Sequence, residues 1–137
     1  MVEPVVDASD KALSLRLSVL DDRLAVCRLD PGAEIPVWAT AAPFFSVTRT
    51  SDELSVVCPE AHVPAEATCE RGWRALRFEG PFEFGLVGVL SSVAEPLTQS
   101  EVSILAIATY DTDYMLVQQL QLDAAVQALR ERGHEVL

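Results

Sequence analysis

The sequence predicts an α+β protein in which helices cover one face of an antiparallel sheet. Apolar and polar residues alternate over residues 13–20, which is typical of a half-buried strand, and further short apolar segments between turn residues indicate strands. Two longer segments in the second half instead repeat their apolar residues at helical spacing. The second half therefore has the element order strand, helix, strand, strand, helix, short strand, written βαββαβ. This order gathers its helices on one side of the sheet.

The first half, residues 12–70, is expected to form a module of strands with shortened helices. Its predicted strands lie at 13–20, 24–29, 44–49 and 54–58. In the first of them, Leu15 and Leu17 alternate with the polar Arg16, which indicates one buried face and one exposed face. A single helical turn is expected at 35–39, because this segment is short and contains a proline.

The second half, residues 71–137, is expected to form a complete βαββαβ module. Its predicted strands lie at 73–79, 102–108, 114–117 and 134–137, and its predicted helices at 84–99 and 122–132. The apolar stripe of the first helix consists of Leu86, Val89, Leu90, Val93 and Leu97. We expect Pro96 to mark a kink or the last turn of that helix, and Gly133 to end the second helix.

Composition and charge exclude several classes of function. The chain has 137 residues and a net charge of −11, with 21 acidic and 10 basic residues, so nucleic acid and anionic membranes should be repelled. No apolar run approaches the ~20 residues that span a bilayer. Residues 1–11 lack the apolar segment of a signal peptide, and the three cysteines form no CxxC pair. We therefore expect a cytoplasmic protein with reduced thiols.

A polar turn between two apolar strands is the strongest functional signal in the chain. It carries two aspartates, two threonines and two tyrosines: Thr109, Tyr110, Asp111, Thr112, Asp113 and Tyr114. A turn needs polar residues, but it does not need so many groups able to hold a small ligand. Together with the helix before it, this turn predicts a ligand-binding regulatory module rather than an enzyme.

Several segments resemble the bacterial tandem ACT-domain proteins, which are related to the ACT repeats of the CASTOR cytosolic arginine sensors. The segments are 44–50, 53–59, 71–76, 79–82 and 107–114. The resemblance implies two ACT-like modules of ferredoxin-like βαββαβ fold and a homodimer formed through their sheets or helices. It also implies amino-acid sensing without catalysis, with the ligand held between ACT modules.

Carried over residue by residue, the resemblance places Gly88 where the family brings bare helix backbone to the ligand. It places Thr109 and Asp113 at the polar strand-turn positions. An amino acid presents a carboxylate and an ammonium group on one carbon. The N–H groups at the helix start would bind the carboxylate, and Gly85 and Gly88 would leave room for it. Asp113 would accept the ammonium group, with Asp111 as the second candidate. No metal and no cofactor is expected.

Structural roles explain the same residues as well. The two glycines would also allow close packing of helix on sheet, and a single aspartate is commonly a turn former that bonds its own backbone. Where the family favours serine before the threonine, this chain has Ala108. This departure favours an alternative, an ACT module that has lost its ligand and only dimerises or binds a partner protein.

An enzymatic role would rest on Asp111 and Asp113 as an acid–base pair. No nucleophile, metal-ligand set or cofactor motif accompanies them, so we predict that the protein is not an enzyme. His62 and His134 are isolated in the sequence and have no second ligand at metal spacing.

Overall fold

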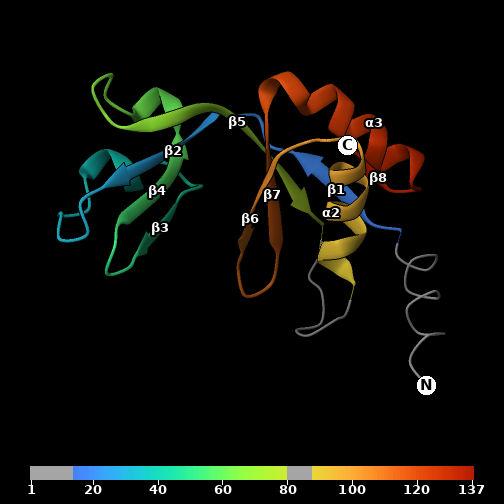
Figure 1. The fold of residues 1–137 in the computed structure, drawn as a ribbon, viewed down its shortest axis with the longest axis horizontal. Helices are drawn as coiled ribbons and strands as arrows, with labels where there is room; N and C mark the ends of the chain where they lie inside the picture. Colours follow the sequence, from blue (N-terminus) through green and yellow to red (C-terminus); the bar gives the residue numbers. More distant parts are fainter. Residues whose placement is uncertain (1–13, 80–87) are drawn as a thin grey trace. The chain divides into compact units, whose positions relative to one another are not determined.

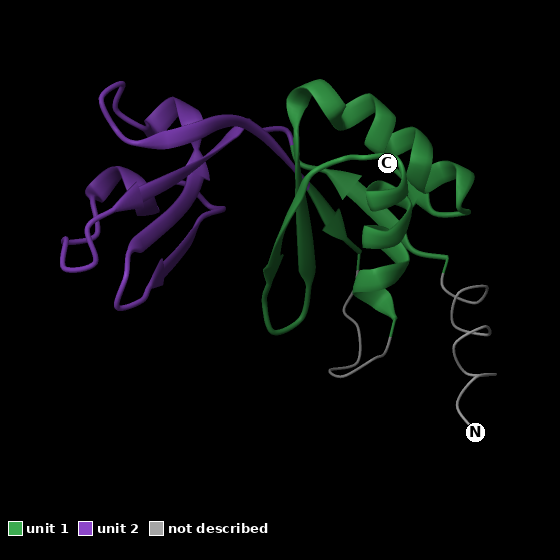
Figure 2. Ribbon diagram, viewed as in Figure 1, with its two compact units in different colours: residues 1–20, 76–137 green, residues 21–75 purple. Residues whose placement is uncertain are grey.

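The computed structural model describes residues 14–79 and 88–137 and divides into two compact units. Figure 1 shows the order of the elements, and Figure 2 shows the units. Unit 1 consists of residues 1–20 and 76–137, and unit 2 consists of residues 21–75. This division differs from a simple break near residue 70, because the first strand of the chain belongs with the C-terminal elements.

Unit 2 is an antiparallel sheet with no α-helix among its residues. Its strands are β2 (Leu24–Leu29), β3 (Ser46–Arg49), β4 (Leu54–Pro59) and the first part of β5 (Cys69–Phe78). β4 lies between β3 and β2, and β2 pairs on its other side with β5. The shortened helices predicted for the first module are two 3₁₀ turns, η1 (Val37–Thr40) and η2 (Glu60–His62).

The α-helices of residues 14–79 and 88–137 both lie in unit 1 and are α2 (Val89–Gln99) and α3 (Leu122–Glu131). Its strands are β1 (Arg16–Val19), the end of β5, β6 (Ile104–Ala108), β7 (Asp113–Gln118) and β8 (Glu135–Val136), and a 3₁₀ turn, η3 (Gln119–Gln121), precedes α3. The strand order is β6-β7-β5-β1-β8. β1 pairs antiparallel with β5 but parallel with β8. The sheet is therefore mixed, where an antiparallel one was predicted, because an N-terminal strand lies between β5 and the last strand.

Both helices pack on the same face of the unit 1 sheet. The strands, and the residue directly before β1, contribute alternate residues to one buried cluster: Leu15, Leu17, Leu76, Phe78, Met115, Val117 and Val136. The helices contribute Val89, Val93, Leu97, Ala125 and Leu129 to the same cluster. The predicted apolar stripe of α2 is confirmed at three positions, but Leu90 is 44% exposed and Leu86 lies outside the described residues.

The two helices end in the same backbone motif. At the end of α3, the N–H of His134 donates to the Leu129 carbonyl (3.0 Å) and the N–H of Gly133 to the Arg130 carbonyl (3.0 Å). This is a Schellman motif with Gly133 in the left-handed region at φ 100°, as the sequence predicts. In α2 the corresponding left-handed residue is Glu101, at φ 61°.

The turn after α3 places a buried histidine between β1 and α2. The imidazole Nδ1 of His134 accepts a hydrogen bond from the N–H of Leu15 (3.0 Å). Its Nε2 lies 2.9 Å from the Ser92 carbonyl oxygen. A backbone N–H can only donate and a carbonyl can only accept, so the proton of this neutral ring is on Nε2. Ser92 needs this donor, because Pro96 stands four residues later in α2 and has no N–H.

Candidate functional site

The predicted anion site lies at the start of α2, where the structure describes one of its two glycines. Gly88 is the N-cap residue of the helix and lies in the left-handed region at φ 91°. A side chain at this position would be strained, which accounts for the glycine. Gly88 has no side chain that could cap the helix, and the first turn of α2 contains no acidic residue. Gly85, the other predicted glycine, lies outside the described residues.

The predicted polar turn is the end of the β6–β7 hairpin. The N–H of Thr109 donates to the Thr112 carbonyl (2.8 Å), and the Thr109 hydroxyl donates to the same oxygen (2.7 Å). The N–H of Thr112 donates back to the Thr109 hydroxyl oxygen (3.2 Å). The Thr109 side chain is therefore engaged in its own turn.

A second hairpin in the chain uses the same turn. In the β3–β4 turn, the N–H of Thr50 donates to the Glu53 carbonyl (2.9 Å). The N–H groups of Asp52 and Glu53 donate to the Thr50 hydroxyl oxygen (3.1 and 3.2 Å). Thr50 and Thr109 thus have the same structural role, in different units. In both hairpins a threonine hydroxyl forms hydrogen bonds within its own turn. This repetition indicates that Thr109 stabilises the turn, whether or not a ligand binds there.

The two aspartates of the turn differ in their surroundings. Asp111 is exposed at the tip, whereas Asp113 is partly buried at the start of β7, opposite Ala108 of β6. Within residues 14–79 and 88–137, no hydrogen bond or ion pair satisfies the Asp113 carboxylate. Asp111 likewise has no such partner among these residues, so the two aspartates differ in burial alone. Tyr110 is 81% exposed and does not line the core.

The start of α2 and the β6–β7 turn lie at the same end of unit 1 (Figure 1). The chain leaves β5, returns through α2 and then runs along β6 to the turn, which brings these two segments to one end of the sheet. This arrangement brings the first turn of α2, whose backbone N–H groups can donate, and the turn that carries Asp113 to the same end of the module. A free amino acid requires a donor for its carboxylate and an acceptor for its ammonium group.

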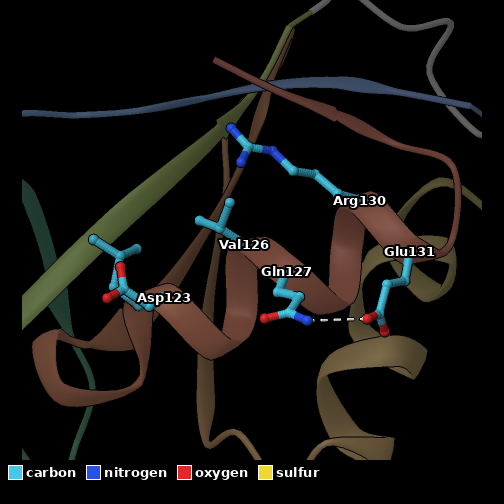
Figure 3. A pocket seen from close by; sticks show the side chains of 6 residues that line it. Asp123, Val126, Gln127, Arg130 and Glu131 are labelled. Carbon is cyan, nitrogen blue, oxygen red and sulfur yellow. Dashed lines mark hydrogen bonds between the residues drawn. The ribbon is translucent and has the colours of Figure 1, made fainter.

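A depression of about 700 Å³ lies along α3 (Figure 3). It is lined by Leu122, Asp123, Val126, Gln127, Arg130 and Glu131. Gln127 donates to Glu131 (3.1 Å), and Arg130 donates to the Val136 carbonyl (2.9 Å). Asp123 and the other polar groups are exposed. The depression therefore offers a solvated helix surface without a buried polar group to orient a ligand.

The residues described in the structure contain no group of three or more His, Cys, Asp or Glu side chains able to hold a metal ion. Within the same ranges, no helix is both long and apolar enough to cross a membrane.

The sequence did not indicate the structural role of His134, which is isolated among the residues around it. The only sequence signal for it was a proline inside a predicted helix, which leaves one carbonyl in need of a donor.

The βαββαβ order of unit 1, with both helices on one face, defines a ferredoxin-like regulatory fold. A family model described as "ACT domain" matches residues 68–131, and a second model, for an N-terminal domain, matches residues 22–66. A protein of solved structure from Agrobacterium tumefaciens is 34% identical, with a TM-score of 0.87 over 91% of this chain and 93% of that one. The chain belongs to the ACT-domain proteins.

The names of more distant relatives describe a sensor and a regulatory subunit. The cytosolic arginine sensor for mTORC1 subunit 1 from Bos taurus is 29% identical over 97 residues, which are 63% of this chain and 30% of the sensor. The chain thus spans less than a third of that relative's length. The regulatory subunit of aspartate kinase from Thermus flavus is 9% identical, with a TM-score of 0.63 over 88% of this chain and 99% of that one, and shows the shared fold alone.

Proposed function

We propose that this protein is a non-catalytic, cytoplasmic regulatory protein that binds a free amino acid. Its membership of the ACT-domain proteins carries the proposal. The name of the bovine relative, an arginine sensor, supports an amino acid as the class of ligand. The arrangement of unit 1 supports the same class, because the first turn of α2 and the β6–β7 turn, which carries Asp113, lie at one end of the module.

In the proposed site, the ligand carboxylate accepts hydrogen bonds from the first turn of α2, and Gly88 leaves the approach open. Asp113 accepts the ligand ammonium group, and Asp111 is the second acidic group of the turn. Thr109 holds the turn through its bonds to Thr112. Gly85 completes the proposed set of binding residues as a sequence prediction.

Replacing Asp113 with asparagine is expected to weaken amino-acid binding by at least roughly tenfold, because a charge-assisted hydrogen bond contributes about 1.5–3 kcal/mol. The measurement is thermal unfolding of the purified protein against each of the twenty amino acids separately. A ligand at about 100 times its Kd stabilises the native state by about 2.7 kcal/mol. Asp52→Asn is the matched control, since Asp52 lies in the corresponding turn of unit 2.

Two results would contradict this assignment. If Asp113→Asn binds the amino acid as tightly as the wild type, Asp113 does not belong to the ligand site. An unchanged melting temperature with all twenty amino acids would favour the alternative function, an ACT module that associates without a ligand. Ala108, where the family favours serine, is the feature of the chain that favours this alternative.

We propose further that two copies associate through β6. This strand pairs only with β7 among the described strands, so its other edge has unpaired backbone groups. Its sequence carries no charge or proline, and Leu105 is 37% exposed. The edge strand β3 of unit 2 instead ends in Arg49, which donates to the Pro31 and Ala33 carbonyls. Charged side chains protect an edge strand against pairing, and β6 lacks them.

Leu105→Lys is expected to raise the dimer dissociation constant by roughly tenfold or more, equivalent to about 1.4 kcal/mol, because it places a charge on the apolar edge. Molar mass measured by light scattering over a dilution series tests this. Thr48→Lys, on the exposed edge of β3, is the control and should leave the mass unchanged. Equal masses for the wild type and both variants at every concentration would exclude association through β6.

A further inference from the structure

Unit 2 has three cysteines on one face of its sheet. Cys27 of β2 stands directly opposite Cys69 of β5, and Cys58 of β4 stands opposite Ala25 of β2. Residues opposite one another on paired strands share a face, and alternate residues of one strand do as well. Cys27 and Cys58 are buried, whereas Cys69 is partly exposed. The cluster therefore joins two core thiols to one thiol that solvent can reach.

The pairing of Cys27 with Cys69 has the geometry of a cross-strand disulfide. The N–H of Arg28 donates to the Thr68 carbonyl (3.0 Å), so these two residues form a hydrogen-bonded pair. In an antiparallel ladder the next pair along, Cys27 and Cys69, is then a non-hydrogen-bonded pair, with Cα atoms about 4.5 Å apart. Disulfides span Cα separations of about 4.4–6.8 Å.

The surroundings give the two sulfurs different roles. Burial, followed by the nearby thiols of Cys69 and Cys58, raises the pKa of Cys27 to about 12, and the Arg71 guanidinium opposes this effect. Cys27 therefore remains a thiol at neutral pH. Arg71 is held beside the cluster by hydrogen bonds to the Glu60 (3.1 Å) and Pro64 (3.0 Å) carbonyls. Cys69 is the partly exposed cysteine of the pair, so an oxidant from solvent meets it before the buried Cys27.

We propose that Cys69 and Cys27 form a peroxide-sensitive modification site, at which Cys69 is oxidised first and Cys27 resolves it as a disulfide. The Cys69 thiolate attacks one oxygen of hydrogen peroxide, the O–O bond breaks, and the leaving hydroxide takes up a proton to form water. Cys69 is then a sulfenic acid. The Cys27 sulfur attacks the Cys69 sulfur, the S–O bond breaks, and the departing hydroxide takes the Cys27 proton. Two thiols and one peroxide thus yield one disulfide and two waters.

The disulfide would secure an irregular part of the sheet. The β2–β5 register shifts between Leu24 and Val26, directly before the cysteine pair. A covalent bond at Cys27 would hold β5 to β2 beyond this irregularity, where backbone pairing is interrupted. The site lies in unit 2, whereas the proposed amino-acid site lies in unit 1, so the two proposals can fail separately.

The test is limited oxidation of the native full-length protein with hydrogen peroxide, followed by alkylation and peptide mapping by mass spectrometry. We expect the number of free thiols to fall from three to one, with a Cys27–Cys69 link and an alkylated Cys58. Dithiothreitol should restore all three thiols. Cys58→Ser is the matched control and should keep the link.

Cys69→Ser should abolish the link, and because Cys69 is partly exposed this variant is expected to fold. Its thermal melt, compared with that of the wild type, checks the fold. Three outcomes would overturn the proposal: three unmodified thiols after oxidation, a link that includes Cys58, or Cys69 oxidised to the sulfinic acid without any link.

Discussion

Replacing His134 with phenylalanine is expected to lower the free energy of unfolding by about 2–4 kcal/mol. The phenyl ring fills a similar volume but has no polar atom. The substitution leaves the Leu15 N–H and the Ser92 carbonyl without their hydrogen-bond partner in a site that is 4% exposed. Buried polar groups without partners cost more than the bonds themselves contribute. Chemical denaturation followed by circular dichroism measures the loss.

A double-mutant cycle with Pro96 tests the physical reason. Pro96→Ala restores an N–H that can donate to the Ser92 carbonyl within α2. In that background, His134→Phe should cost roughly 1–2 kcal/mol less, because only the Leu15 N–H loses its partner. Equal losses in both backgrounds would mean that the histidine does not replace the helix bond that Pro96 removes. His62→Phe, at an exposed position, is the control and should change stability little.

Leu17→Asp is expected to unfold unit 1. Leu17 of β1 is fully buried in the cluster that joins the sheet to both helices. An aspartate there would leave a carboxylate in an apolar core, at a cost comparable to the ~5–15 kcal/mol that stabilises a whole domain. Both α-helices of the described part of the chain belong to unit 1, so their circular dichroism signal should be lost.

Two further observations make this experiment specific. Trp38 and Trp73 both lie in unit 2, so tryptophan fluorescence reports on that unit while the helical signal reports on unit 1. Arg16→Ala, on the next residue of the same strand, removes only an exposed ion pair with Glu135 (3.2 Å) and should change stability by less than about 1 kcal/mol. A full helical signal in Leu17→Asp would show that β1 is dispensable for unit 1.

Local patterns in the sequence predicted most of the elements. Alternation of apolar and polar residues predicted β1, because a half-buried strand presents a period of two, and short apolar segments between turn residues predicted β2 and β4. Helical spacing predicted α2 and α3, and Gly133 predicted where α3 ends. These signals depend on neighbours in the chain, so they can be read from sequence alone. Leu90 was assigned to the buried stripe but is exposed, because one side of a helix offers more apolar positions than its packing surface covers.

The candidate site was predictable only in part. The sequence indicated the polar turn and Gly88, and the positive φ of Gly88 supports its importance for the backbone. The hydrogen bonds of Thr109 within its own turn, and the same arrangement at Thr50, became evident only from the structure. A threonine that holds a turn and one that holds a ligand look identical in a sequence, because the difference lies in where the hydroxyl proton points.

The sequence by itself determined the α+β class, the order of the elements, the polar turn and the acidic, apolar-rich composition of this protein. Tertiary structure alone decided that β1 lies between β5 and β8 and that Cys27 faces Cys69. It also decided that His134 donates to a carbonyl 42 residues away in the chain. The physical reason is that periodicity and turn chemistry act over a few residues, whereas strand order and side-chain partners depend on which distant segments pack together.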